Sequence, residues 1–262
     1  MKSELDKKLR KHIEILENEV FFTKNKWPHF SLLLKDMSEF SLKLKANLTV
    51  VSLERTLLYG GYSLLAPFFD KQNFISIDCS PSSADDRGSY NEELINNSNF
   101  IKISTSKRAD ISNTGLEDCL ADLVLIPNLV HHIADQDMLF QEMARILKPG
   151  GKVYIFEPLV RELHQIPDDF LRYTPFGIAA VLKKVGLEME SYDLEGGPFS
   201  VIAYCWTQAL QYFPDQDRKK MEDWFYNQHF IDLMKWDIEH TDNKVRPFTK
   251  FPMSFSIKAI KN

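Results

Sequence analysis

Residues 121–158 form the segment that most constrains how this chain can fold. Asp122 to Ile126 is a largely apolar run of strand length, and Pro127 ends it. Asp135 can cap a helix, because its carboxylate can accept a hydrogen bond from the first helical turn. The helix then carries four apolar residues on one face, the spacing of a helix that packs against a sheet: Leu139, Met143, Ile146 and Leu147.

A tight turn and a second strand follow this helix. Pro149 cannot continue a helix, and Gly150 and Gly151 supply turn conformations that side chains disfavour. Lys152 to Phe156 is the second strand, and such a strand–helix–strand unit predicts a right-handed parallel crossover. In parallel sheets, the loops at the carboxyl ends of the strands face the ligand. This places four polar residues at the edge of the expected site: Asn128, His131, His132 and Glu157.

Composition narrows the class of protein. The net charge of −5, from 32 basic and 37 acidic residues, argues against a nucleic acid as partner, because phosphate binding needs a basic face. Cys79, Cys119 and Cys205 lie far apart, which excludes a disulfide framework and a thiolate zinc site. No apolar run approaches the ~20 residues of a membrane span, and the charged start lacks the apolar core of a secretory signal. We therefore expect a cytoplasmic protein with no membrane span.

Residues 1–50 are predicted to form a helical cap ahead of the sheet. A first helix places Leu9, Ile13, Leu16 and Val20 on one face, and Trp27-Pro28 separates it from a second. The second helix has its own apolar face: Phe30, Leu33, Leu34, Met37 and Phe40. These faces can pack on the core or on a second subunit, so a homodimer stays open.

The first strands of the sheet are expected around a pair of glycines. Glu54 to Tyr59 is the predicted first strand, and Gly60-Gly61 breaks it before a helix over Tyr62–Phe69. Phe74 to Asp78 is the second strand. An acid about 20 residues beyond a glycine turn binds the ribose hydroxyls in nucleotide-binding α/β folds. Asp78 has this position, although a strand-end aspartate can also simply cap a turn.

The rest of the chain supplies one more early strand and the carboxyl-terminal elements. Asn99 to Ser104 is the predicted third strand. Thr174-Pro175 begins a helix that Gly186 ends, and Leu187 to Leu194 is the next strand. Two aromatic-rich helices over 200–213 and 215–239 precede a last strand, Met253 to Ile260, whose apolar residues alternate with polar ones. The polar stretch Ser82–Asn91 is either a loop that closes over a ligand or a solvated loop.

The combination of three short motifs resembles the second half of a class I S-adenosylmethionine-dependent methyltransferase of the methyltransferase-11 type. The motifs are LVHHI (129–133), RILKPGG (145–151) and FEP (156–158). The resemblance implies an α/β fold with a Rossmann-like, seven-stranded, mostly parallel sheet, an antiparallel last strand and helices on both faces. It implies that residues 51–262 form the methyltransferase-like domain, with a helical insertion at about 199–240.

The resemblance also implies S-adenosylmethionine as the cofactor. The family has an acid at the end of the first strand, followed by a Gly-x-Gly-x-Gly loop. Aligned on Gly60, this chain has Leu58 at the acid position and side chains at the two later glycine positions, Tyr62 and Leu64. Asp78 would bind the ribose, and Asp110 the adenine amino group. The expected cofactor-binding residues are Tyr59, Gly60, Gly61, Asp78, Cys79, Asp110, Ile111 and Asn128.

Methyl transfer from a sulfonium is an in-line displacement that needs a positioned acceptor and a base for its proton. His131 is the expected catalytic base, because the ordinary pKa of histidine suits this task, and Glu157 and His164 are the alternatives. Adjacent histidines are not expected to point into one pocket, and they lack the i, i+4 spacing of a helical metal site, so no metal is expected. The expected substrate-binding residues are His132, His164, Arg172 and Tyr173.

Two functions follow from these patterns. The first is methyl transfer to an oxygen or nitrogen of a small molecule, such as a sugar or a biosynthetic intermediate. The second is a catalytically inactive methyltransferase-like domain that serves as a binding or partner subunit, which the altered glycine loop favours.

Overall fold

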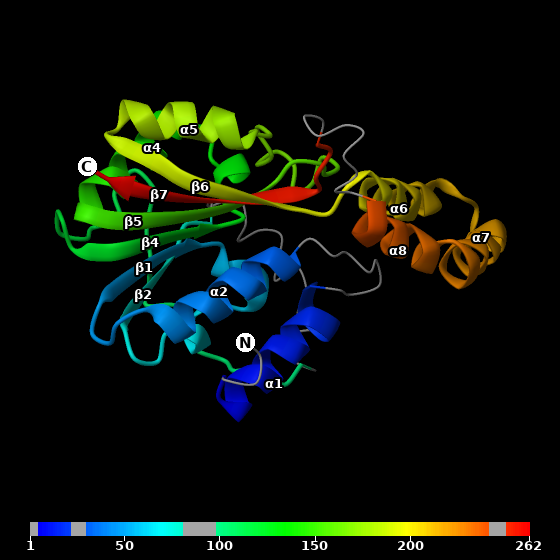
Figure 1. The fold of residues 1–262 in the computed structure, drawn as a ribbon, viewed down its shortest axis with the longest axis horizontal. Helices are drawn as coiled ribbons and strands as arrows, with labels where there is room; N and C mark the ends of the chain where they lie inside the picture. Colours follow the sequence, from blue (N-terminus) through cyan, green and yellow to red (C-terminus); the bar gives the residue numbers. More distant parts are fainter. Residues whose placement is uncertain (1–4, 22–29, 81–97, 241–249) are drawn as a thin grey trace.

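A central seven-stranded sheet organises the computed structural model, which describes residues 5–21, 30–80, 98–240 and 250–262 (Figure 1). The strand order is β3-β2-β1-β4-β5-β7-β6. The strands are β1 (Thr49–Glu54), β2 (Asn73–Asp78), β3 (Lys107–Arg108), β4 (Ala121–Pro127), β5 (Leu147–Pro158), β6 (Leu187–Glu195) and β7 (Ser254–Lys261). β1 to β5 pair in parallel, and β7 runs antiparallel to both of its neighbours. The predicted sheet, with its antiparallel last strand, is therefore confirmed.

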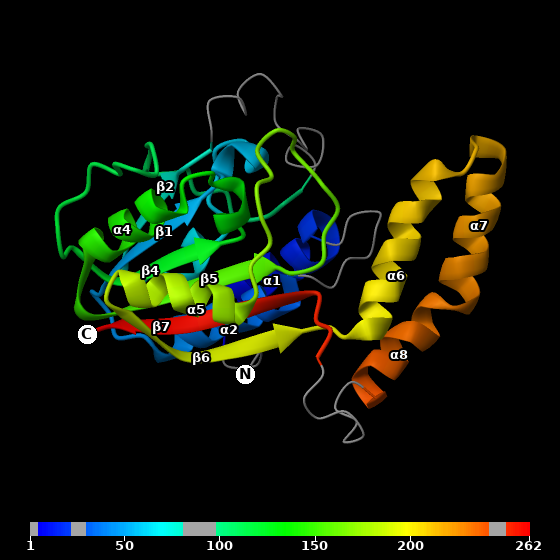
Figure 2. The same ribbon diagram turned by 90° about the horizontal axis from the view of Figure 1, so that it is seen from above.

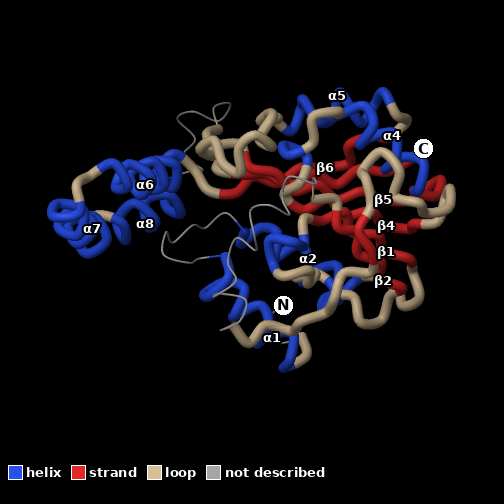
Figure 3. Tube along the Cα trace, turned by 180° about the vertical axis from the view of Figure 1, so that it is seen from behind, coloured by secondary structure: helices blue, strands red, loops and turns tan. Residues whose placement is uncertain are grey.

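Helices cover both faces of this sheet (Figures 1 and 3). α4 (Gln136–Ile146) and α5 (Pro175–Lys184) lie on one face, and α1 (Lys7–Ile15) and α2 (Ser31–Lys43) lie on the other. Alternation along the buried strands divides the core: Val124 and Ile126 of β4 pack with α4, whereas Leu123 and Leu125 pack with the amino-terminal helices. The apolar faces predicted for the described parts of those two helices are thus used against the sheet.

A buried aspartate fastens α2 to the sheet. Asp36 is 2% exposed and accepts hydrogen bonds from the Tyr154 hydroxyl of β5 at 3.0 Å and the Ser256 hydroxyl of β7 at 3.0 Å. Its other oxygen lies 2.8 Å from Nζ of Lys258. Burial and the Asp36 charge raise the pKa of Tyr154, so the phenol keeps its proton and donates. One carboxylate therefore connects a helix to two neighbouring strands.

A helical arm projects from the carboxyl-terminal side of the sheet, well apart from α1, α4 and α5 (Figure 2). It consists of α6 (Pro198–Ala209), a short 3-10 turn (Leu210–Tyr212), α7 (Asp215–Gln228) and α8 (Phe230–His240). The Asp237 carboxylate of α8 accepts from the backbone nitrogens of Gly197 and Phe199, at 2.7 and 3.1 Å, and so caps the start of α6. The second of the two predicted helices is interrupted at His229.

The predictions for the first part of the sheet were wrong in three places. β1 ends at Glu54, and Thr56–Tyr59 is a 3-10 turn rather than a strand. Where a helix was expected over 62–69, the structure has only the 3-10 turn Ala66–Phe68. Residues 99–103 form no strand, because Ile103 bonds to the Ser63 nitrogen instead of to β2.

The later elements agree with the sequence except before the second strand of the crossover: Leu147, expected on the helix, and the expected turn at 149–151 both lie within β5. Asp135 caps α4 by accepting from the Met138 nitrogen at 3.0 Å, and Thr174 caps α5 in the same way through the Gly177 nitrogen at 3.1 Å. Gly186 follows α5 with φ +78°, a conformation that suits glycine. The stretches around Trp27-Pro28 and Ser82–Asn91 lie outside the described residues.

Candidate functional site

A pocket opens at the carboxyl ends of β1 and β4. The sheet order changes direction between these two strands, and α/β sheets bind ligands in the crevice at such a switch point. The ends of both strands and α2 supply its wall: Phe30, Leu33, Glu54, Arg55, Leu58, Tyr59, Leu64, Leu65, Pro127 and Asn128. Two of the expected site residues, Tyr59 and Asn128, line this pocket. Phe30 and Leu33 show that the amino-terminal segment closes one side of it.

Glu54 is the acid at the end of the first strand, and it was not among the site residues expected from the sequence. In the family motif, the three glycines follow the acid by two, four and six residues. Because β1 ends at Glu54, these glycine positions fall on Thr56, Leu58 and Gly60. The alignment that put Leu58 at the acid position was therefore wrong by four residues. The run TVVSLE pairs with β2 on one side and β4 on the other, whereas the more apolar LLY lines the pocket. Because LLY (57–59) is more apolar than residues 49–54, the strand was predicted at 54–59 instead.

The Glu54 carboxyl is 6% exposed and accepts from the Ser63 hydroxyl at 2.8 Å. Burial, with a smaller contribution from the Asp78 charge, raises its pKa from 4.5 to about 7. The folded protein therefore holds this proton more tightly than the unfolded chain does, and stability is lost as the pH rises from 4.5 to 7. At about 1.4 kcal/mol per pKa unit, the loss amounts to about 3 kcal/mol.

Glu54→Gln should remove this pH dependence, because an amide keeps the acceptor oxygen for Ser63 but cannot ionise. Urea unfolding at pH 5, 6, 7 and 8 should show the variant losing less stability across the series than the parent protein. Glu190→Gln is the matched control, because Glu190 is an exposed carboxylate that pairs with Lys152. Parallel pH profiles of Glu54→Gln and the parent would contradict the assignment.

Asp78 ends β2 directly beside Glu54 and is 3% exposed. Its Oδ1 accepts from the Thr56 nitrogen at 2.9 Å and from the Ser80 hydroxyl at 2.7 Å. Within the described residues its buried Oδ2 has no hydrogen-bond partner, and Nε of Arg108 lies 3.8 Å away. One oxygen thus ties the loop after β1 to β2, and the other is available to a ligand donor.

Asn128 follows β4 with φ +58°, a left-handed conformation that asparagine tolerates better than most residues. Its nitrogen donates to the Phe156 carbonyl at 2.7 Å. Its side-chain Oδ1 is buried and accepts no hydrogen bond from the part of the chain that the structure describes. Within the described residues, Asp78 Oδ2 at the end of β2 and Asn128 Oδ1 after β4 are therefore buried acceptor oxygens without a hydrogen bond.

The other expected cofactor residues lie around the same edge of the sheet. Gly60 and Gly61 have φ of +65° and +80° and form the end of the turn after β1. The Cys79 side chain is 5% exposed and belongs to the core, so only its backbone faces this edge. Asp110 is exposed and accepts from the Ser112 nitrogen and hydroxyl, at 2.8 and 2.6 Å, and these bonds lower its pKa. Ile111 packs against the core beside it.

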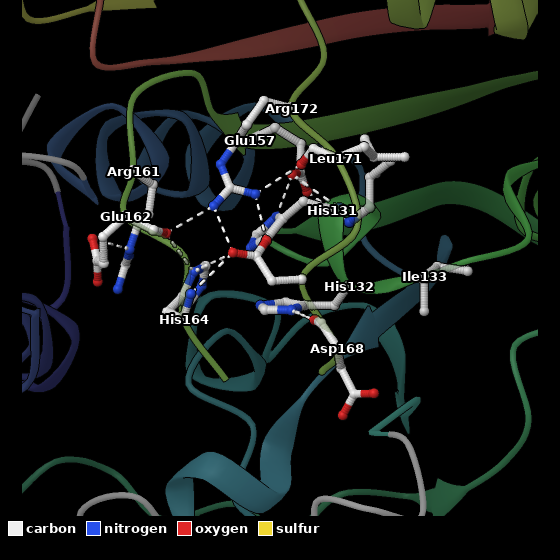
Figure 4. A network of polar contacts seen from close by, with 12 residues as sticks. His131, His132, Ile133, Glu157, Arg161, Glu162, His164, Asp168, Leu171 and Arg172 are labelled. Atoms are coloured by element: carbon white, nitrogen blue, oxygen red, sulfur yellow. Dashed lines mark hydrogen bonds and ion pairs between the residues drawn. The ribbon is translucent and has the colours of Figure 1, made fainter. Parts of the chain in front are cut away.

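Three histidines meet in one cluster (Figure 4). His131 and His132 lie in the 3-10 turn Val130–His132 after β4, and His164 lies in the loop after β5. The ring centroids of His131 and His132 are 3.9 Å apart, and that of His164 is 5.3 and 4.9 Å from them. Their exposed fractions are 1%, 3% and 9%. The turn places both adjacent rings in this interior cluster, and neither is among the residues that line the pocket.

Each ring is held through its Nδ1 atom. His131 Nδ1 lies 2.6 Å from Glu157 Oε2, and Glu157 also accepts from the Val130 nitrogen at 2.7 Å. His132 Nδ1 bonds to the Asp168 carbonyl. His164 Nδ1 lies 3.2 Å from both Asp169 Oδ2 and the Glu162 carbonyl. All of these partners come from the loops after β4 and β5, apart from Glu157 near the end of β5.

The surroundings of the cluster disfavour protonated histidine. Burial lowers the pKa of His132, and the charges of His131 and Arg55 add to the effect. Burial and the Arg161 charge lower the pKa of His164 to about 3. Although burial opposes it, the bond from Arg172 brings the pKa of Asp169 down to about 2, so this carboxylate is ionised. His132 and His164 are therefore neutral at physiological pH.

Arg172 and Tyr173 lie beside the cluster in the same loop. Arg172 contacts both Asp169 oxygens, and it donates to the carbonyls of Leu171 and Glu162 at 2.8 and 3.0 Å (Figure 4). These bonds hold the loop that carries His164. Tyr173 is half-buried and packs on the core. Arg55, which the sequence analysis did not select, lines the pocket and acts on His132, so it links the pocket to the cluster.

Comparison with known proteins agrees with this geometry. Residues 60–155 match the family described as a methyltransferase domain. A putative sarcosine dimethylglycine methyltransferase from Galdieria sulphuraria shares the fold with a TM-score of 0.52 at 16% identity, over 98% of this chain and 99% of that one. A putative methyltransferase from Bacillus halodurans gives 0.50 at 14% identity, over 87% and 99%. None of the curated proteins compared with the chain matches it.

Residues 60–155 thus match a methyltransferase domain, and the chain has the fold of the putative methyltransferases it resembles. The match to this domain supports a methyltransferase. Among the described residues, no helix is long and apolar enough to cross a membrane.

Proposed function

We propose that this protein transfers a methyl group from S-adenosylmethionine to an oxygen or nitrogen of a small molecule, such as a sugar or a biosynthetic intermediate. The observation that carries the proposal is the pocket at the β1/β4 switch point, with two donor-free acceptor oxygens on the flanking strands. A buried polar atom without a partner is costly, so a ligand with matching hydroxyl or amino groups would be favoured there. The cofactor supplies an electrophilic methyl group when bound.

The residues have distinct parts in this proposal. Asp78 Oδ2 accepts from a ribose hydroxyl, Asn128 Oδ1 accepts from an amino or hydroxyl group, and Tyr59, Gly60 and Gly61 form the wall beside them. Cys79, Asp110 and Ile111 border the adenine side. Phe30 and Leu33 support a role for residues 1–50 as a cap over the pocket. The residues from 51 onward form the catalytic domain, and the helical arm is its insertion.

His131 and Glu157 are the proposed catalytic pair. The Glu157 carboxylate can only accept from Nδ1, so it fixes the tautomer in which His131 Nε2 carries a lone pair. A base oriented by a carboxylate is the arrangement that activates hydroxyl groups in many enzymes. His132, His164, Arg172 and Tyr173 then shape the acceptor side. We place this chemistry in the cytoplasm, and we retain the homodimer as a hypothesis.

The second candidate is a methyltransferase-like domain without activity. Thr56 and Leu58 replace two glycines of the loop, and Leu58 lines the pocket where a glycine would leave room. Titration calorimetry with S-adenosylmethionine and S-adenosylhomocysteine separates the candidates. Heat of binding with one site per chain supports the enzyme. No detectable heat at millimolar ligand would leave only the inactive domain.

Asp78→Asn should weaken cofactor binding roughly 10- to 100-fold, because hydrogen bonds to a charged group contribute about 1.5–3 kcal/mol. The asparagine retains an acceptor for the Thr56 nitrogen, so the loop after β1 keeps its anchor. The dissociation constant for S-adenosylhomocysteine gives the readout. Asp118→Asn is the control, because Asp118 is an exposed carboxylate on the far side of α4. An unchanged constant in folded Asp78→Asn would remove Asp78 from the cofactor site.

A further inference from the structure

The histidine cluster has a feature that methyl transfer does not require. A ring nitrogen of each of His131, His132 and His164 lies within 4.8 Å of those of the other two. Zinc bonds of about 2.0–2.1 Å at tetrahedral angles put ligand nitrogens about 3.3 Å apart. Small rotations of the three rings would bring their nitrogens to that separation. The cluster is therefore close to the geometry of a three-histidine metal site.

The hydrogen bonds assign the same tautomer to all three rings. The partners of Nδ1 are the Glu157 carboxylate, the Asp168 carbonyl, and the Asp169 carboxylate with the Glu162 carbonyl. Each of these groups accepts hydrogen bonds and donates none, so Nδ1 carries the proton on every ring. The Nε2 atom of each of the three rings then carries no proton and can donate its lone pair. Within the described residues, His131 Nε2 is buried and has no hydrogen-bond partner.

We propose that His131, His132 and His164 bind a divalent transition-metal ion, zinc, through their Nε2 atoms. Metal-binding histidines almost always donate their other nitrogen to a carboxylate or a backbone carbonyl, and every ring in this cluster does so. Three nitrogen ligands suit zinc, whereas calcium and magnesium prefer oxygen. The fourth position of a tetrahedral ion remains for water or a substrate oxygen.

The charges around the cluster are compatible with a dication. Glu157 and Asp169 bring two carboxylates into direct contact with the rings. Arg172 forms an ion pair with Asp169. The positive charges of Arg55 and Arg161 act on His132 and His164, respectively, and so oppose the binding of a cation. Arg55 lines the pocket, and Arg161 lies in the loop after β5. Coordination by three neutral imidazoles outweighs this repulsion, because each offers a fixed lone pair at a buried site.

The metal site goes beyond the proposed function and revises one part of it. A proton and a metal ion use the same lone pair of His131, so His131 acts as a base only when the metal is absent. The spacing argument against a metal considered only the adjacent pair of histidines. The third ligand comes from His164, which lies more than thirty residues further along the chain. The test therefore measures metal directly and does not depend on turnover.

The experiment uses the full chain without an affinity tag. The protein is stripped with a chelator, incubated with zinc chloride, passed through a desalting column, and analysed for metal by elemental mass spectrometry. We expect one zinc per chain and a higher melting temperature than that of the stripped protein. His164→Ala should lose the zinc, and Glu157→Gln should weaken its binding roughly 10- to 100-fold. His240→Ala is the control, because His240 is an exposed histidine at the end of α8.

Two outcomes would overturn the proposal. In the first, the stripped protein is folded but takes up neither zinc nor cobalt. The second is an adventitious ion only, in which His164→Ala and His132→Ala retain the zinc of the parent while His240→Ala loses it. Circular dichroism of each variant shows that a loss of metal is not a loss of fold. Cofactor calorimetry on the same samples keeps this result separate from the proposed methyl transfer.

Discussion

In the metal-free protein, replacement of His131 by alanine should lower turnover roughly 100- to 10,000-fold, the usual contribution of a positioned base. The ring is 1% exposed and is fixed by Glu157 at 2.6 Å, so no solvent group can take its place. The cofactor dissociation constant should stay the same, because the proposed cofactor residues lie on the loops after β1, β2 and β4 rather than on this ring. The effect should therefore appear in kcat.

The measurement is steady-state formation of S-adenosylhomocysteine, with an acceptor chosen from a panel of small alcohols, sugars and amines. His240→Ala serves as the control for loss of a histidine. Glu157→Gln tests the partner, because an amide can present its donor to Nδ1 and so disturb the tautomer. Full turnover in folded His131→Ala would remove this residue from the chemistry.

Asp36→Ala should lower the free energy of unfolding by about 3 kcal/mol, because it leaves buried donors without their acceptor. Three groups lose a partner at once: the hydroxyls of Tyr154 and Ser256, and the ammonium of Lys258. Lys258 remains partly exposed, so water compensates for part of its loss. Urea unfolding measures this loss. The same substitution should also loosen the attachment of α2, which faces the pocket.

Asp193→Ala provides the comparison for Asp36. Its carboxylate lies 3.4 Å from the same Lys258 nitrogen, but its side chain is half-exposed. Exposed pairs contribute little, so this variant should change stability by less than about 1 kcal/mol. Equal losses in the two variants would show that Lys258 alone, and not the buried network, determines the effect of Asp36.

The accuracy of the sequence predictions differs between the two parts of the chain, for a physical reason. From Ala121 onward, the caps at Asp135 and Thr174 and the glycine at Gly186 mark element ends by local chemistry, and the structure agrees. Around β1, the apolar residues Leu58 and Tyr59 line a pocket instead of forming a strand, so of the six residues predicted from hydrophobicity only Glu54 belongs to β1. Periodicity identifies core residues, but it does not distinguish a core from the wall of a binding pocket.

The candidate site divides in the same way. Asp78 and Asn128 were found from their places at strand ends, which a strand pattern reveals directly. Glu54 and Arg55 were missed because they depend on the exact end of β1. The meeting of His164 with His131 and His132 has no signal in the sequence, since the three lie on loops whose paths depend on bonds such as Arg172 to Asp169.

The sequence by itself determined the α/β architecture, the parallel crossover at 121–158 and the strand ends where a ligand would bind. These features follow from local caps, glycines and the alternation of side chains, which act over a few residues. Only the tertiary structure decided where β1 ends, which oxygens lack donors and that three histidines converge. Each of these depends on contacts between segments far apart in the chain, and no local pattern encodes a distance.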